Sequence, residues 1–509
     1  MPRYTCLNPI CGRTTENAWL AVTTCHHCKG TALRQEVTTT VASSSQPVGR
    51  TVAPIGKATT SKPPGKATIP IPIPIPTPSG KAMTVAMPPH PLLLSDILVQ
   101  LFELFDERSV GLLARVCRRW HHAATIVLRR YVADARGFGS GSGLTMKSQI
   151  LGLLANTSNL SLAVDKFMPI SPGDGGSILA YIVKHQIKLT LKLGTPNPKL
   201  QEQLLKASQD PTFIYKYAEI RELRRRGKEP ALLDYESENV TQFGGLKLKL
   251  PGGHIQTGLM HNKFWILDND GIVTGSPNVS FSAMEGGNFE SCIYIRSAKL
   301  APLYQKYFQL LSIPYSGDSK EWQAFEKQVS LYNTNSTRVK AAFAPTINIS
   351  DFVIEHLKGA TKITVRQFLV STADRDDDYS IVPFLCWMAE QDAEVEVFLD
   401  EAAYRKYTFV QKAASSLMQS GGKVYLQTPV KVVGAQEGLQ HDKLILATFH
   451  NGVKRTLLGS AGATVSVIAN INAENFLCLD LPKVYDELME HHQNTRKGTT
   501  TKVLVPRKY

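Results

Sequence analysis

Long apolar runs are absent from this chain of 509 residues. No stretch of ~18 uncharged apolar side chains occurs, so we expect no membrane-spanning helix. Residues 1–13 also lack the apolar core of a secretory signal, which leads us to expect a cytoplasmic protein. Disulfides are rare in that compartment, so the eight cysteines are interpreted as thiols or metal ligands.

Acidic residues are scarce near the N-terminus. Residues 1–145 hold 16 Lys+Arg against 7 Asp+Glu, whereas the remaining residues hold 41 against 36, within a net charge of +14. A basic chain favours nucleic acid or an anionic surface as partner. That argument applies only weakly to the nearly balanced C-terminal part, which does not favour a long nucleic-acid track.

Half of the cysteines lie in residues 1–35. Two pairs, Cys6-x4-Cys11 and Cys25-x2-Cys28, are separated by 13 residues. Four thiolates from two short loops can complete a tetrahedral zinc shell and fold a segment too small for its own core. The spacing resembles a zinc ribbon, which implies one structural Zn²⁺ on these four residues. Reduced free cysteines are the alternative.

A segment with few large side chains follows, over residues 36–90. It is rich in Thr, Ser, Pro, Lys and Ala, and we expect a disordered linker. Its residues 69–78 alternate with proline, which predicts a polyproline II rod. The rod is interpreted as a semi-rigid spacer, with a docking peptide for a proline-reading domain as the alternative.

Residues 91–135 show apolar side chains at helical spacing. The ending Val116-Cys117-x-x-Trp120 resembles an F-box. That resemblance implies docking to the Skp-type adaptor of a cullin ubiquitin ligase, in a eukaryotic cell or in the host cytoplasm of a pathogen. Leu98, Leu101 and Trp120 are then expected to form the docking surface or to support it. An ordinary helical hairpin packed on the next domain is the alternative, and residues 137–143 are expected to be a flexible joint.

From residue 146 to 492 strand and helix patterns alternate, which predicts an α/β fold. Two halves, 146–315 and 336–492, run through similar series of elements and indicate an internal duplication. The expected strands are 160–167, 187–193, 362–368, 395–399 and 423–426, and the expected helices are 176–185, 379–391 and 404–418.

Each half contains a His-x-Lys segment. The first reads His261-x-Lys263, then Asp268, Gly-Ser276-x-Asn278 and, ten residues on, Asn288-x-Glu290. Alternate residues of a strand share a face, so the imidazole and the ammonium are expected to project together. A turn at residues 269–271 brings the hydroxyl and the amide alongside them. These groups suit an oxyanion such as a phosphodiester.

The second segment reads His441-x-Lys443, then Gly-Ser460 and, later, Glu474. Its spacing from lysine to Gly-Ser is four residues longer, which a longer hairpin loop near 450–452 would absorb. Thr448 and Gly462 stand where the first copy has Asp268 and Asn278.

The two copies resemble the HxKx4Dx6GSxN signature of the phospholipase D superfamily, over about 146–492. The resemblance implies a duplicated, two-lobed α/β/α domain and a phosphodiesterase that forms a covalent phosphohistidine without a catalytic metal. The implied site residues are as follows: His261 as nucleophile, His441 as acid and base, Glu290 and Glu474 as their orienting carboxylates, Lys263, Lys443 and Asn278 as charge-stabilising groups, Ser276 and Ser460 as phosphate-binding hydroxyls, and Asp268 as a structural residue. Gly462 puts one phosphate-positioning amide in doubt.

The substrate stays open in the sequence. The nearly balanced charge favours a phospholipid over nucleic acid, with peripheral membrane contact, although a basic run at 221–228 could bind either or be a solvated helix face. The rival interpretations are a phospholipase D-family nuclease, or an F-box substrate receptor whose second domain only recognises a phosphorylated ligand. Retention of both histidines and both lysines favours an enzyme, because a receptor needs no nucleophile.

Overall fold

The chain divides into two units, Met1–Leu94 and Ser95–Tyr509. The computed structural model describes backbone and side chains for residues 95–140, 144–168, 178–194, 259–313, 315, 318–371, 381–429, 438–464, 472–497 and 502–504, and the backbone alone for residues 3–6, 14–15, 33–36, 91–94, 215–219, 247–249, 255–257 and 500–501.

The first unit contains a three-stranded antiparallel sheet in the order β2-β1-β3. Its strands are β1 Arg3–Cys6, β2 Thr14–Thr15 and β3 Leu33–Glu36. Of the four predicted zinc ligands, Cys6 lies at the end of β1, and the other three lie outside the described residues, as do residues 69–78. The zinc site and the polyproline rod therefore stay predictions. Among the described residues no cluster of three His, Cys, Asp or Glu could hold a metal ion.

Three helices follow, as the apolar spacing predicts. They are α1 Pro91–Phe102, α2 Glu107–Leu113 and α3 Arg118–Tyr131. Their small core is built around Phe102 and Val110, and Trp120 packs edge-on against Phe102 with ring centroids 5.4 Å apart. Asp106 caps α2 by accepting a 2.8 Å hydrogen bond from the backbone N–H of Ser109, which satisfies a free donor of the first turn.

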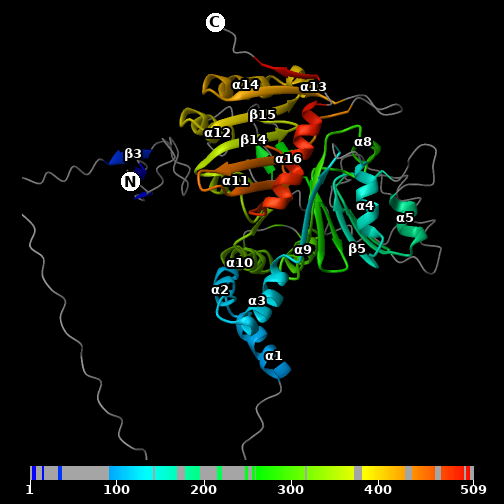
Figure 1. Cartoon of the computed structure of the whole chain (residues 1–509). Helices are drawn as coiled ribbons and strands as arrows, with labels where there is room; N and C mark the ends of the chain where they lie inside the picture. Colours follow the sequence, from blue (N-terminus) through cyan, green and yellow to red (C-terminus); the bar gives the residue numbers. More distant parts are fainter. Residues whose placement is uncertain are drawn as a thin grey trace, which may run out of the picture. The chain divides into compact units, whose positions relative to one another are not determined.

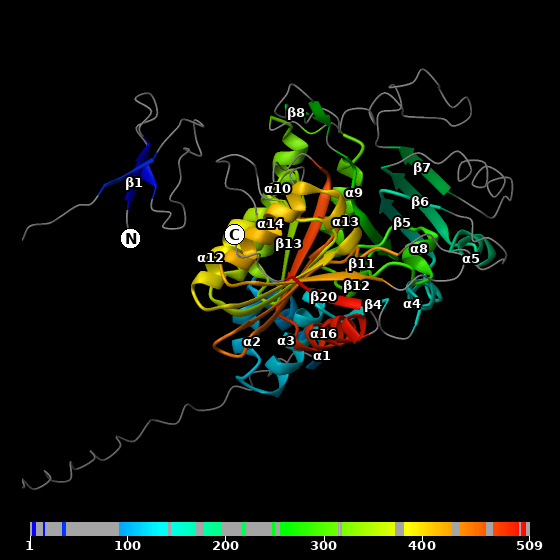
Figure 2. The ribbon, with the colours of Figure 1, turned by 90° about the horizontal axis from the view of Figure 1, so that it is seen from above.

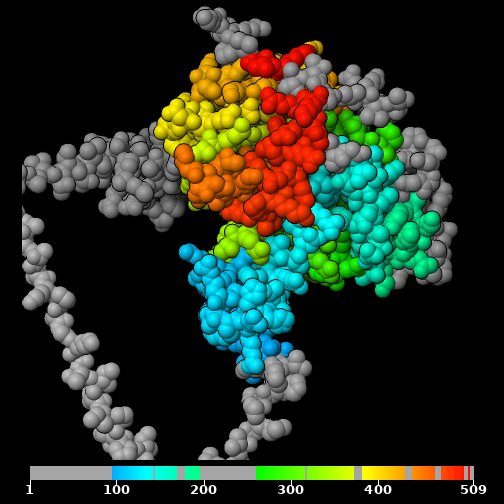
Figure 3. Space-filling model, viewed as in Figure 1, coloured from blue at the N-terminus to red at the C-terminus, as the bar shows by residue number. Residues whose placement is uncertain are grey.

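The helical segment is fixed to the following domain through Glu107. This carboxylate is buried and accepts hydrogen bonds from the backbone N–H of Thr337, at 2.6 Å, and from the guanidinium of Arg338. Burial alone would raise the pKa of Glu107, but these partners hold it below its usual value. In Figure 3 the helices stand out from the larger body to which this contact fixes them.

The first lobe is built on a seven-stranded sheet in the order β4-β12-β11-β10-β5-β6-β7, in which β5, β6 and β7 are parallel and the other neighbours antiparallel. The strands are β4 Asp134–Gly139, β5 Asn159–Val164, β6 Lys188–Leu193, β7 Tyr215–Glu219, β10 Lys263–Leu267, β11 Gly271–Gly275 and β12 Ser291–Arg296. The helices are α4 Met146–Leu154, α5 Ile178–Lys184, α8 Phe281–Met284, α9 Ala301–Leu310 and α10 Lys320–Asn335. A separate pair consists of β8 Lys247–Lys249 and β9 Ile255–Thr257.

The second lobe repeats this strand order as β13-β19-β18-β17-β14-β15-β16 and adds β20 at the edge. The strands are β13 Val339–Ala344, β14 Ala360–Gln367, β15 Glu394–Asp400, β16 Lys423–Thr428, β17 Lys443–Phe449, β18 Lys454–Gly459, β19 Glu474–Leu479 and β20 Thr500–Val503. The helices are α11 Ile349–Leu357, α12 Ile381–Glu390, α13 Glu401–Lys406, α14 Thr408–Gln419 and α16 Pro482–Lys497. The shared strand order agrees with the predicted duplication, and Figure 1 shows the lobes as two sheets flanked by helices.

The predicted elements are present with small shifts of their ends. The one expected helix over residues 404–418 is divided into α13 and α14, because Tyr407 between them has an extended backbone, with φ −114° and ψ 116°. The other expected strands and helices correspond to β5, β6, β14, β15, β16, α5 and α12.

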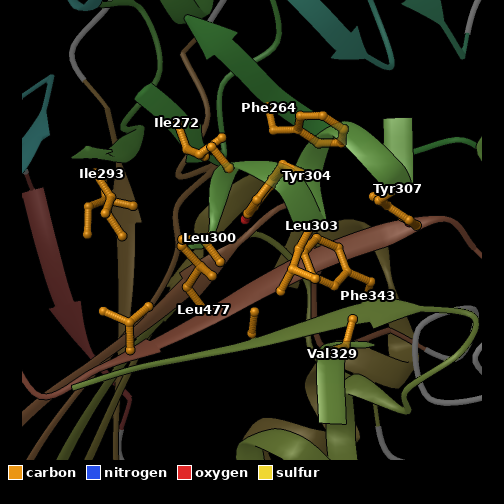
Figure 4. Packing of buried hydrophobic residues seen from close by; sticks show 14 of the residues in the cluster. Phe264, Ile272, Ile293, Leu300, Leu303, Tyr304, Tyr307, Val329, Phe343 and Leu477 are labelled. Carbon is orange, nitrogen blue, oxygen red and sulfur yellow. The ribbon is translucent and has the colours of Figure 1, made fainter. Parts of the chain in front are cut away.

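A shared apolar core joins the two lobes. Phe264 and Ile293 of the first sheet belong to the same buried cluster as Phe343 and Leu477 of the second. Figure 4 shows Tyr307 among these side chains. The centroids of the Tyr307 and Phe343 rings are 4.8 Å apart. Separate clusters cover the outer face of each sheet, beneath α4 and α5 in one lobe and beneath α11, α12 and α14 in the other. The lobes are therefore held in one arrangement by burial of both inner faces.

The glycines at residues 137–139 allow close packing, so the prediction of a flexible joint is wrong there. They lie in β4, which pairs with β12 upstream of the expected domain start at residue 146. A Cβ on Gly137 would lie 2.6 Å from Cγ of Leu488, and one on Gly139 would lie 2.4 Å from Nδ1 of His491. The missing side chains let α16 approach the sheet. Figure 2 shows α16 beside β4. No helix in the described part of the chain is long and apolar enough to cross a bilayer.

Candidate functional site

The two His-x-Lys segments enter the two central antiparallel strands at equivalent places. Lys263 is the first residue of β10 and Lys443 is the first of β17, and both are almost fully buried. Each ammonium turns back onto the backbone of its own motif. Lys263 Nζ donates to the carbonyl oxygen of His261 at 2.9 Å, and Lys443 Nζ donates to that of His441 at 3.1 Å.

Backbone hydrogen bonds between the lobes place these segments against each other. The N–H of His261 donates to the carbonyl of Ala473 at 3.0 Å, and the N–H of His441 donates to that of Phe289, also at 3.0 Å. Isolated bridges pair Met260 with Ala473 and Phe289 with Gln440. Each His-x-Lys segment thus lies beside the Asn-x-Glu segment of the opposite lobe.

The two histidines exchange carboxylate partners between the lobes. His261 Nδ1 lies 2.8 Å from Glu474 Oε1, and His441 Nδ1 lies 2.9 and 3.0 Å from the two carboxylate oxygens of Glu290. The Glu474 and Glu290 side chains are at most 1% exposed, whereas those of His261 and His441 are 23% and 14% exposed. Because Nδ1 contacts a carboxylate, Nε2 is the nitrogen that faces away from it on each ring, and Nε2 of His441 lies 3.3 Å from Lys443 Nζ. Sequence analysis identified these four residues but not the exchange.

Two hydroxyls and two amides hold the carboxylates. Ser276 Oγ donates to Glu290 at 2.5 Å, and Ser460 Oγ donates to Glu474 at the same distance. Within each Asn-x-Glu segment the asparagine, Asn288 or Asn472, donates to the glutamate two residues on, at 3.0 and 3.3 Å. Both serine side chains are fully buried. The serines predicted as phosphate ligands thus contact the glutamates.

The residue between the histidine and the lysine is Asn262 in the first copy and Asp442 in the second. Each of them supports its segment from the inner face. Asn262 accepts a 3.0 Å hydrogen bond from Asn475 of the other lobe and donates to Tyr307. Asp442 forms a fully buried ion pair with Arg366, at 2.8 Å. These partners could not be predicted from the sequence, because nothing in the motif spacing indicates what packs behind it.

The pKa values of the two carboxyl groups are shifted in opposite directions. Burial raises the pKa of Glu474 to about 8, although Lys263 and the hydrogen bond from Ser460 oppose the shift. Burial would also raise the pKa of Glu290. The contact with His441, together with the nearby Lys443 and Ser276, instead keeps the pKa of Glu290 below its usual value. At neutral pH Glu290 is therefore ionised, whereas the carboxyl group of Glu474 is mostly neutral.

The pKa values of both histidines and of Lys443 are lowered. Burial, reinforced by Lys263, holds the pKa of His261 well below its ordinary value. Burial also lowers the pKa of His441, although the Glu290 charge opposes it. Burial and the charge of Lys263 lower the pKa of Lys443 to about 8. Lysines of different lobes are therefore close enough for their charges to repel each other.

Three further polar residues, Asp268, Asn278 and Asp165, lie around the two segments. Asp268 accepts hydrogen bonds from the backbone N–H groups of Ser158 and Asn159, at 2.9 and 2.8 Å, so it ties its hairpin to the start of β5. Asn278 accepts from the backbone N–H of Lys166 at 3.2 Å. Asp165, which sequence analysis missed, is buried, and its charge raises the pKa of Lys263 against the effect of burial.

Comparison with known families finds one match. Residues 220–311 match the model described as cardiolipin synthase, phospholipase D-like domain. This range contains the whole first motif, from His261 to Glu290, and not the second. A search of curated proteins finds no match.

Several solved structures are similar in part. Phosphatidylserine synthase from Haemophilus influenzae Rd KW20 aligns with a TM-score of 0.48 and 12% identity, over 73% of this chain and 88% of that one. Polyphosphate kinase from Porphyromonas gingivalis aligns with a TM-score of 0.41 and 10% identity, over 73% and 48%. The phospholipase D family member Nuc from Salmonella typhimurium aligns with a TM-score of 0.26 and 20% identity, over 32% and 97%. The family match supports a phospholipase D-like domain over residues 220–311.

Proposed function

We propose that the protein is a phospholipase D-like phosphodiesterase that works through a covalent phosphohistidine. The observation that carries the proposal is the exchange of carboxylates, in which His261 is held by Glu474 and His441 by Glu290. Two imidazoles are thereby oriented from opposite lobes, each with Nδ1 on a carboxylate and Nε2 facing away from it. A nucleophile and an acid–base group on opposite sides of one phosphorus atom are what a two-step displacement needs.

His261 is assigned as the nucleophile. Its low pKa keeps the ring neutral near pH 7, and in the tautomer whose Nδ1–H donates to Glu474 the Nε2 lone pair can attack phosphorus. The bond from phosphorus to the leaving oxygen breaks, and that oxygen takes a proton from His441. The ionised Glu290 stabilises the protonated His441 ring, which suits it to the acid role. In the second step His441 removes a proton from water, whose oxygen displaces His261 from phosphorus.

The lysines and serines take different parts in this proposal. Lys263 and Lys443 supply positive charge beside the developing negative charge on phosphorus. Asn278 supplies an amide for a phosphoryl oxygen. Ser276 and Ser460 act by positioning the glutamates that they contact, in place of the direct phosphate contacts expected from the sequence.

For the substrate we favour a phospholipid. The support is the nearly balanced charge of the C-terminal part and the description of the matching family model as cardiolipin synthase. The test is incubation of the full-length protein with labelled phosphatidylglycerol, phosphatidylcholine and single-stranded DNA in parallel. Release of a headgroup, lost in both His261→Ala and His441→Ala, supports the proposal. Cleavage of the DNA alone would favour the nuclease interpretation.

A docking role for the helical segment remains a second proposal. Apolar side chains on α1 and in the loop that follows it are exposed: Ile97 by 51%, Leu101 by 43% and Leu104 by 81%. Leu98 and Trp120 are partly buried and support this surface from below. A Skp-type adaptor is the expected partner. Co-purification with the full-length protein tests the proposal, and Leu101→Glu should abolish binding without unfolding the chain. Adaptor binding unaffected by that change would contradict it.

A further inference from the structure

The two lobes differ in the groups beside their lysines. In the first lobe Asn278 places a side-chain amide near the end of β11. At the equivalent position after β18 the second lobe has Gly462, which has no side chain. If both lobes hold one phosphate, the second lobe therefore lacks one donor that the first supplies.

Another amide lies at this place in the second lobe. Gln367 is the last residue of β14 and is the direct partner of Lys443 across the antiparallel pair. In the first lobe the partner of Lys263 is Val164, which is apolar. Directly opposed residues in such a pair lie on one face, with Cβ atoms about 4.5–5.5 Å apart. The Gln367 side chain thus extends on the same face as the Lys443 side chain.

The carboxamide of Gln367 has no partner of its own. The residue is 1% exposed, and within the described part of the chain neither Oε1 nor Nε2 makes a hydrogen bond. A buried amide without partners is costly, and in a native protein it requires an explanation. The Gln427 amide and the Nε2 atom of Gln440 are also unpartnered in the described part of the chain. Gln440 alternates with His441 and therefore faces the opposite side of the strand.

The Gln367 amide borders the space that a side chain at residue 462 would enter. A Cβ built on Gly462 would lie 3.9 Å from Gln367 Oε1 and 3.7 Å from the Thr464 side chain, both ordinary contacts. The backbone of Gly462 is not among those with positive φ, so it can accept another residue. Each lobe thus has one amide at these two equivalent positions. In the first lobe Asn278 supplies it and Val164 is apolar. In the second lobe Gln367 supplies it and Gly462 has no side chain.

We propose that Gln367 is a substrate-binding residue that supplies the amide missing at Gly462, with Nε2 donating to a non-bridging oxygen of the substrate phosphate beside Lys443. The inference rests on the proposed phosphodiesterase function and extends it to a residue outside both motifs. It also explains how the second motif can lose its asparagine and still bind a phosphoryl group.

The test uses three variants of the full-length chain. Gln367→Met removes the amide at nearly constant length. The double variant Gln367→Val with Gly462→Asn gives the second lobe the arrangement of the first. Thr456→Val is the matched control, because Thr456 is also fully buried with an unpartnered hydroxyl but lies on the inner face with Leu458. Thermal unfolding confirms that each variant folds, and the loss of an orphaned buried group should not lower the melting temperature.

Two readouts separate this inference from the function on which it rests. Calorimetric binding of inorganic phosphate should weaken by roughly tenfold or more in Gln367→Met, and kcat/KM for a chromogenic phosphodiester should fall similarly. The double variant should recover both, and Thr456→Val should change neither. Unchanged phosphate affinity in Gln367→Met, or a double variant no better than Gln367→Met, would overturn the inference. An inactive wild type whose phosphate binding depends on Gln367 would overturn the hydrolase proposal and leave the inference standing.

Discussion

The exchange of carboxylates between the lobes predicts that the two glutamates respond unequally to the same neutral substitution. Glutamine has nearly the shape of glutamate but no charge. The structure places Glu290 and Glu474 in matching hydrogen bonds, each to a histidine, a serine and an asparagine. Their protonation differs, since the pKa of Glu474 is raised to about 8 and that of Glu290 is lowered.

The magnitude follows from these shifts. A group with a pKa of about 8 is roughly 90% protonated at pH 7, so Glu474→Gln removes a charge that about a tenth of the molecules carry. Glu290→Gln removes a full charge and leaves a single acceptor oxygen for three donors. A hydrogen bond to a charged group contributes about 1.5–3 kcal/mol, which corresponds to about 10–100-fold in rate. We expect a loss of that order in kcat/KM for Glu290→Gln and a loss of no more than a few-fold for Glu474→Gln.

The assay is kcat/KM at pH 7 for a chromogenic phosphodiester, repeated at pH 9. At the higher pH Glu474 is ionised in the wild type, so the effect of Glu474→Gln should grow toward that of Glu290→Gln. Equal losses at pH 7 would refute the assigned protonation states. A larger loss in Glu474→Gln would reverse the roles of the two histidines.

The remaining predictions concern charge and packing. Because the pKa of Lys443 is lowered to about 8, kcat/KM should fall on the alkaline side of pH 8, and a pH–rate profile that rises there would contradict the role given to its charge. Asp442→Asn leaves Arg366 buried without a counter-charge and should lower the free energy of unfolding by about 3–5 kcal/mol in urea denaturation, whereas a loss under 1 kcal/mol would contradict that pairing. Gly139→Ala should destabilise the chain by about 1–3 kcal/mol, because its methyl group would overlap an imidazole of α16. Gly152→Ala in α4 meets nothing within 4 Å and should raise the melting temperature slightly, and equal effects of the two alanines would show that α16 does not pack as described.

The local geometry of the site could be predicted from the sequence, because it depends on neighbours along the chain. The His261-x-Lys263 spacing, the hairpin that follows and the turn at residues 269–271 all correspond to β10 and β11. The longer second hairpin is also as expected, with β17 ending at Phe449 and β18 beginning at Lys454. Strand alternation and turn chemistry suffice for such elements.

The pairing between the lobes could not be predicted in this way. Glu290 lies 27 residues after Lys263 of the same lobe, yet it contacts His441, which is 151 residues away in the sequence. That contact depends on how the two sheets pack, which no spacing within one motif encodes. The same holds for Ser276, whose hydroxyl was expected to face the phosphate and instead contacts Glu290. The glycines before residue 140 suggested a joint, because their role becomes apparent only once α16 lies against them.

The central claim is that one histidine from each lobe belongs to a single active site, with His261 as the nucleophile. The most direct measurement is intact-protein and peptide mass spectrometry of His441→Ala after reaction with a phosphodiester that has a good leaving group. Without its base this variant should retain a phosphoryl adduct on His261, while His261→Ala should form no adduct. An adduct on His441 in the His261→Ala protein would reverse the assignment, and full activity in either variant would contradict the shared site.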